Sequence, residues 1–200
     1  HLLYARFITK ALRDFGYLDF GEPFKKLIHQ GTITKDGAKM SKSKGNTVSP
    51  DEFIEQYGSD TFRAYLMFMG PFEDGGDWND KGITGISRFL AKVVRVCGRI
   101  DKNHTTESSI IKLVHKTIEA VGADLNQLKF NTAISKLMEL LNVLSKVDKL
   151  DDFTIKSLIL LLAPITPHLS EELWSKYSDD GISVFDQQWP QFDTSLIVND

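Results

Sequence analysis

Four or five consecutive segments with helical periodicity constrain this 200-residue chain more than any other feature. From residue 86 onward, apolar residues recur every three or four positions, which places them on one face of a helix. The stripes comprise Ile86, Phe89, Leu90, Val93, Cys97 and Ile100; Ile111, Val114, Ile118, Val121, Leu125 and Leu128; and Phe130, Ile134, Leu137, Leu141 and Leu144. A last helix is expected to begin at residues 166–167 and to carry Leu169, Leu173, Trp174 and Tyr177. Short connections between such helices predict an antiparallel bundle, with the all-apolar residues 158–162 at its centre.

The chain before this bundle predicts shorter, mixed elements. Residues 1–15 have helical spacing and end at Gly16, and residues 24–34 favour a strand followed by a turn at residues 36–37. Ser49 is placed as an N-cap, with Pro50 at the first helical position and Glu52 completing a capping box. A second short helix is expected over residues 60–69, and the polar, glycine-rich residues 71–80 are expected to be a connection that ends this part.

The charge is divided unevenly along the chain, although its net value is only −3. Residues 1–102 have a net charge of +3, whereas residues 103–200 have a net charge of −6 and contain no arginine. A polyanionic partner is therefore expected to meet the first half. The single Cys97 lies in an apolar stripe, which predicts a buried thiol in a reducing compartment without catalytic thiol chemistry. No apolar run is long enough to span a membrane, and no signal-peptide core is present.

A lysine-rich segment, KDGAKMSKSKGN at residues 35–46, has no apolar periodicity and is expected to be a loop. Its four lysines face a single acid, Asp36. A mobile cationic loop suits a triphosphate whose charge is redistributed as pyrophosphate leaves. Most runs of this composition are solvated surface loops. The pentapeptide formed by Lys39, Met40, Ser41, Lys42 and Ser43, together with its neighbours, favours the functional interpretation.

These neighbours resemble a known family. KMSKS followed by KGN, Val48 and Pro50, then Tyr57, Gly58, Asp60 and Arg63, is similar to the second signature of class I aminoacyl-tRNA synthetases. Other segments resemble the leucyl-tRNA synthetases in particular. These segments are HLLYARF at 1–7, PFKKLIHQG at 23–31, MFMGP at 67–71, RFLAKV at 88–93 and PITPHLSEELW at 164–174.

The resemblance implies a mainly α fold in two parts. Residues 1–75 would be the C-terminal part of a Rossmann-type catalytic domain with the KMSKS loop. Residues 76–200 would be the helical anticodon-binding bundle that contacts tRNA. Lys39 and Lys42 would be the catalytic lysines, and Lys39, Met40, Ser41, Lys42 and Ser43 would bind ATP.

The reaction implied is activation of leucine by ATP, assisted by Mg²⁺, and transfer of leucine to tRNA(Leu). The family's His-x-Gly-His signature is absent, because no two of the five histidines have that spacing. We therefore expect no activity from this chain alone and no tightly bound cofactor or metal. A cytoplasmic monomer is expected. A non-catalytic module that docks tRNA or a protein is the alternative, and the isoleucyl, valyl and methionyl enzymes remain alternatives within the class.

A basic stripe provides a candidate tRNA-binding face. Arg88, Lys92, Arg95, Arg99 and Lys102 are spaced by four, three, four and three residues, which would place them within roughly an 80° arc of one helix. Asp101 is the only acid between Ile83 and Lys102. The stripe fits either a rail for phosphates or a solvated helix face. Trp78 is expected to pack rather than to stack on a base, and Trp174 and Trp189 are expected to be structural.

Overall fold

The computed structural model describes residues 2–179 and 181–197, and its fold is mainly helical. The chain divides into two compact units, residues 1–30 and residues 31–200. In the first unit, α1 spans Leu2–Asp14 and ends where Gly16 adopts a φ of +80°, as the sequence predicts. Glu22 then folds back and forms ion pairs with Arg6 at 2.8 Å and with Lys10 at 2.9 Å. These hydrogen bonds lower the pKa of Glu22 to about 2.

The second unit begins with a small three-stranded sheet in the order β2-β1-β3. Strand β1 (Thr32–Lys35) pairs antiparallel with β2 (Ala38–Lys39) and parallel with β3 (Gly75–Trp78). Two expectations need correction here. Residues 24–31 form no strand, since the partner strand β3 begins at Gly75, opposite Thr32, and offers them no pairing. The expected connection over residues 71–80 contains β3. Just before β1, the chain passes so close to the start of β3 that only glycine fits at position 31. A Cβ at Gly31 would lie 1.9 Å from the Gly75 nitrogen.

Two short helices follow the hairpin. Helix α2 spans Pro50–Tyr57 and α3 spans Ser59–Phe68, with Gly58 between them at a φ of +85°. Ser49 is the N-cap residue, but its side chain makes no capping hydrogen bond, so the predicted capping box is wrong. Pro50 at the first helical position, with Asp51 and Glu52 in the first turn, favours this helix start instead.

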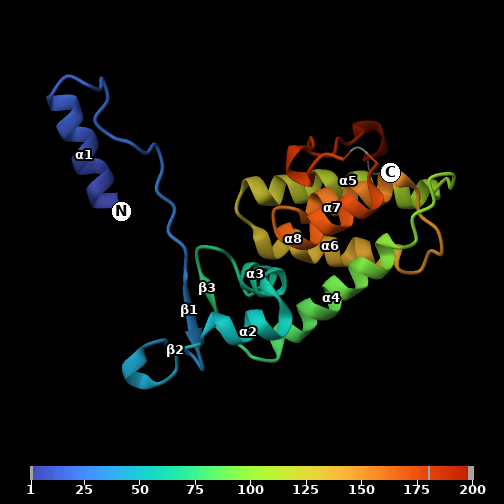
Figure 1. Ribbon diagram of the computed structural model, residues 1–200, viewed down its shortest axis with the longest axis horizontal. Helices are drawn as coiled ribbons and strands as arrows, with labels where there is room; N and C mark the ends of the chain where they lie inside the picture. The colour runs from blue at the N-terminus through green and yellow to red at the C-terminus, as the bar shows by residue number, and fades with distance from the viewer. Residues whose placement is uncertain (1, 180, 198–200) are drawn as a thin grey trace. The chain divides into compact units, whose positions relative to one another are not determined.

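The remaining helices form the bundle that the apolar stripes predict (Figure 1). They are α4 (Gly82–Cys97), α5 (Ser108–Asn126), α6 (Phe130–Leu144), α7 (Asp152–Leu162) and α8 (Pro167–Tyr177). Helix α5 packs on α6 and α7, α4 packs on α6, and α7 packs on α8. The connections of three residues between α5 and α6 and of four residues between α7 and α8 make these neighbours antiparallel.

The core of the bundle follows the predicted stripes closely. Ile134, Leu137, Leu158 and Ile159 have no exposed surface. The ends of two stripes depart from helix geometry. Leu128 has a φ of +58° in the turn after α5, and Ile100 follows α4 and bridges to Leu150. The 3-10 turns η2 (Val184–Asp186) and η3 (Thr194–Leu196) follow α8.

Candidate functional site: the lysine loop and the basic residues of α4

The lysine-rich segment is more ordered in its backbone than the expected loop. Asp36 and Gly37 form the tight β1–β2 turn, with φ values of +54° and +70°, and Lys39 ends β2. The chain then forms a short 3-10 turn, η1 (Lys42–Lys44), which ends at Gly45 with a φ of +65°. Met40 is half-buried and packs against the hydrophobic core, so the loop is anchored in its middle.

The lysines of this segment present their charge to solvent. Lys39, Lys42 and Lys44 are exposed, and Lys35 is half-buried. Within the described residues none of the four takes part in an ion pair. Four unpaired ammonium groups on a short hairpin and turn make a cationic surface that would attract a polyphosphate.

Two side chains that the sequence analysis did not single out hold this segment. The amide oxygen of Asn46 accepts a hydrogen bond from the Ser41 N–H at 2.9 Å, and the Asn46 amide nitrogen donates to the Lys39 carbonyl at 3.3 Å. From β3, the Asp77 Oδ1 accepts from the Gly37 N–H at 2.9 Å and from the Thr34 hydroxyl at 2.5 Å. The parallel pairing of β1 with β3, which periodicity did not indicate, brings Asp77 to the hairpin.

The basic stripe is divided by the end of α4. This helix stops at Cys97, so Arg99 and Lys102 lie outside it and the expected continuous five-residue rail on one helix is wrong. The Arg99 guanidinium donates to the carbonyls of Ser145 and Val147 at 2.8 and 2.7 Å. Those carbonyls follow the C-terminus of α6, where a cation is favoured. Lys102 pairs with Asp179.

Three members of the stripe remain on α4 itself. The Lys92 ammonium donates to the Asn142 amide oxygen at 2.7 Å and is half-buried. Arg88 and Arg95 are exposed and have no ion pair or hydrogen bond from their side chains among the described residues. Arg88 and Arg95 are therefore the members of the stripe whose guanidinium groups are available to phosphates.

The interpretation of Trp78 and Cys97 as structural side chains is supported. Trp78 is 4% exposed and lies edge-on to the rings of Phe53 and Tyr65, at centroid distances of 4.7 and 5.1 Å. Its indole nitrogen donates to the Asp80 carboxylate at 2.6 Å. Cys97 is fully buried, and burial raises the pKa of its thiol to about 12, which keeps it protonated.

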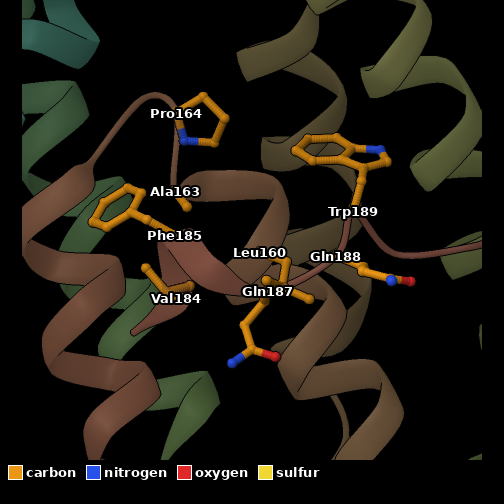
Figure 2. Close-up of a pocket in the computed structure, with 8 residues that line it drawn as sticks. All are labelled: Leu160, Ala163, Pro164, Val184, Phe185, Gln187, Gln188 and Trp189. Atoms are coloured by element: carbon orange, nitrogen blue, oxygen red, sulfur yellow. The ribbon is translucent and has the colours of Figure 1, made fainter. Parts of the chain in front are cut away.

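A cavity of about 320 Å³ lies between the end of α7 and the segment that contains η2 (Figure 2). It is lined by Leu160, Ala163, Pro164, Val184, Phe185, Gln187, Gln188 and Trp189. None of these side chains is titratable, so the cavity offers neither a general acid or base nor a charge for phosphate. It has the character of an apolar groove and not of a catalytic site.

Among residues 2–179 and 181–197, no group of three or more histidine, cysteine, aspartate or glutamate side chains is arranged to hold a metal ion. No helix in the same ranges is both long and apolar enough to cross a membrane.

Comparison with known families accounts for most of the chain. Residues 7–78 match a model of class I tRNA synthetases (I, L, M and V), and residues 107–200 match the anticodon-binding domain of tRNA ligase. The lysine loop falls in the first range and helices α5 to α8 in the second, whereas α4 lies between them. The chain belongs to the class I aminoacyl-tRNA synthetases.

Within this family, the chain is similar to leucine–tRNA ligases. The chain is 46% identical to a leucine–tRNA ligase of Clostridium perfringens and 43% identical to that of Caldanaerobacter subterraneus subsp. tengcongensis. In both cases the match covers all of this chain and 27% of the relative, so the chain spans about a quarter of their length. A solved structure, the ternary complex of Agrobacterium radiobacter K84 agnB2 LeuRS with tRNA and LeuAMS, matches with a TM-score of 0.80. It is 31% identical, and the match covers 99% of this chain and 28% of that one.

Asp77 accepts hydrogen bonds from Thr34 and Gly37, here called the Asp77 brace, and their strength should depend on pH. Hydrogen bonds from Thr34 and from the Gly37 N–H lower the pKa of Asp77. The carboxylate form is therefore favoured by folding, so the brace is complete at neutral pH and is lost as the pH falls through the lowered pKa. In NMR spectra, the Gly37 amide proton should titrate with a midpoint below the ordinary value of an aspartate, about 3.9.

The control for this titration is Asp77→Asn, in which the Gly37 amide should show no acid-induced shift. A Gly37 shift that persists in Asp77→Asn, or a midpoint at or above the ordinary value, would contradict the brace.

Proposed function

We propose that this chain is the part of a leucyl-tRNA synthetase that supplies the KMSKS loop and the tRNA-contacting bundle. In this proposal residues 1–75 are the C-terminal part of a Rossmann-type catalytic domain, and residues 76–200 are the anticodon-binding bundle. The observation that carries the proposal is the match of the whole chain to leucine–tRNA ligases. The KMSKS sequence adds Lys39 and Lys42, which form no ion pair among the described residues. The reaction proposed is the activation of leucine with ATP and its transfer to tRNA(Leu).

The loop would act on the phosphates of ATP. When leucine attacks the α-phosphate, negative charge passes to the departing pyrophosphate, and preorganised cations at that place lower the barrier. We assign this role to Lys39 and Lys42, which lie on either side of the half-buried Met40 and Ser41. Met40, Ser41 and Ser43 would complete the ATP contacts. Magnesium would enter with ATP, as a complex with its phosphates.

The bundle would bind tRNA through the phosphate backbone. Arg88 and Arg95 carry this part of the proposal, because both are exposed on α4 and have no side-chain partner in the part of the chain that the structure describes. Lys92, Arg99 and Lys102 would add positive charge nearby, although each already has a protein partner. The acidic second half of the sequence would face away from the polyanion.

The catalytic part is tested by leucine-dependent ATP–pyrophosphate exchange, measured on the complete polypeptide whose reading frame contains residues 1–200. Lys42→Ala should lower the exchange rate by about 100-fold, the usual cost of removing one preorganised electrostatic group. Lys81→Ala removes an exposed lysine outside the loop and should leave the rate unchanged. The 200-residue chain alone should show no exchange.

A complete polypeptide that shows no leucine-dependent exchange would contradict the synthetase proposal and favour a binding module. Exchange by the isolated 200-residue chain would overturn the expectation that it is incomplete.

The tRNA part is tested by the salt dependence of binding to the complete polypeptide. Arg88→Gln combined with Arg95→Gln should weaken tRNA(Leu) binding roughly ten-fold and reduce the slope of log K against log salt by about two. Lys112→Gln on α5 removes an exposed cation of the acidic half and should change neither quantity. Equal slopes for the double variant and the parent protein would leave α4 as a solvated face.

A further inference from the structure

We propose that Asn46 is a positioning residue for the two lysines of the loop. This proposal rests on the proposed function, in which Lys39 and Lys42 contact ATP. Nothing in the Asn46 side chain needs to touch ATP: both of its hydrogen bonds go to the backbone of the loop. Its contribution is to fix the backbone from which the two lysines project.

The amide of Asn46 acts at both sides of Met40. Its oxygen accepts from the Ser41 N–H at 2.9 Å, and its nitrogen donates to the Lys39 carbonyl at 3.3 Å. A carboxamide accepts through its oxygen and donates through its nitrogen at the same time, and asparagine has a shorter reach than glutamine. The two hydrogen bonds therefore join the end of the segment, Asn46, to its beginning at Lys39 and Ser41.

The neighbouring contacts also involve the backbone of the loop and not the lysine side chains. Ser41 is extended, with a φ of −150°, and its N–H is directed to Asn46 while its carbonyl accepts from the Lys44 N–H at 3.2 Å. The 3-10 turn beginning at Lys42 therefore starts from a residue that Asn46 holds. Met40 fixes the same stretch from the other side, because it packs against the core.

The two Asn46 hydrogen bonds, here called the Asn46 brace, matter because they preorganise the loop. A free loop of this length would lose backbone entropy when its lysines gather around the phosphates, and that loss would weaken ATP binding and the transition state alike. A brace that acts only through backbone atoms reduces this loss without consuming a lysine. Removal of the brace should therefore affect steps that involve ATP and spare the binding of leucine and tRNA.

The first measurement follows the brace itself in the 200-residue chain and does not depend on any activity. Amide hydrogen exchange by NMR should show the Ser41 N–H exchanging roughly 2- to 10-fold faster in Asn46→Ala, the factor expected for loss of one net hydrogen bond. Asn46→Asp replaces the donor nitrogen with an oxygen that would face the Lys39 carbonyl, so it should not restore slow exchange at Ser41. Thr47→Ala, at the next exposed position, is the matched control and should exchange like the parent chain.

The second measurement follows positioning in the complete polypeptide. Asn46→Ala should lower kcat/KM for ATP in pyrophosphate exchange by about 10- to 100-fold, a cost typical of misplaced reacting groups. The KM for leucine and the thermal midpoint should stay unchanged, which a merely structural defect would not allow. Thr47→Ala should leave all these constants unchanged.

The two measurements separate this proposal from the proposed function. Unchanged Ser41 exchange in Asn46→Ala, or slow Ser41 exchange in Asn46→Asp, would overturn the two-bond role of Asn46 whatever the activity of the complete polypeptide. Unchanged kcat/KM for ATP in an active Asn46→Ala enzyme would overturn the positioning role. A parent polypeptide without leucine-dependent exchange would instead contradict the proposed function, and with it the assignment of ATP as the ligand that Asn46 serves.

Discussion

Helix α3 joins the loop-bearing part of residues 31–200 to the bundle, through its packing on α4 and α6 and through polar contacts with the beginning of α8. The Asp60 carboxylate accepts from the Leu169 N–H at 2.6 Å and contacts the His168 Nδ1 at 2.9 Å, so a side chain of α3 caps the N-terminus of α8. Three residues further along α3, the Arg63 guanidinium donates to the carbonyls of Pro164 and Ile165 at 3.3 and 3.4 Å. An acid therefore meets the positive end of one helix and a cation meets carbonyls just before it, and both come from one short helix.

Helix α3 also contacts the three-stranded sheet, at the end of β3. Tyr65 of α3 is 5% exposed, and its hydroxyl exchanges hydrogen bonds with the Asn79 carbonyl and N–H at 2.8 and 3.1 Å. Its ring lies edge-on to Trp78, the last residue of β3, and β3 in turn pairs with β1 and provides Asp77 to the β1–β2 turn. The path from the bundle to the lysine loop thus runs through α3, Trp78 and the parallel strands. If the loop binds ATP and α4 binds tRNA, this path sets the distance between the two ligands.

The sequence predicted the parts of this fold that have a repeating pattern. Stripes at three- and four-residue spacing found the bundle helices and their core because every turn of a buried helix face leaves an apolar residue. Strand β3 was missed because glycines and an aspartate occupy three of its four positions, and its pairing partner lies more than 40 residues away. The end of α4 is signalled locally by Gly98, its C-cap residue, which the regular spacing of the basic residues outweighed in the prediction. The contacts of Arg99 with the carbonyls of residues 145 and 147 are tertiary and have no local signal. The lysines of the loop were recognisable from sequence, whereas the Asn46 and Asp77 contacts that hold them depend on loop closure and strand pairing.

The central claim, that α3 fixes the loop-bearing part on the bundle, can be tested by one distance measurement. Spin labels at Glu55→Cys on α2 and Lys116→Cys on α5 occupy exposed positions on the two parts, while the native Cys97 is buried. Double electron–electron resonance should give a narrow distance distribution for the parent chain. The distribution should broaden when Asp60→Ala and Arg63→Ala are combined, with the helical content unchanged. Equal widths in the two proteins would contradict the account, because the two parts would then be held together without the polar contacts of α3.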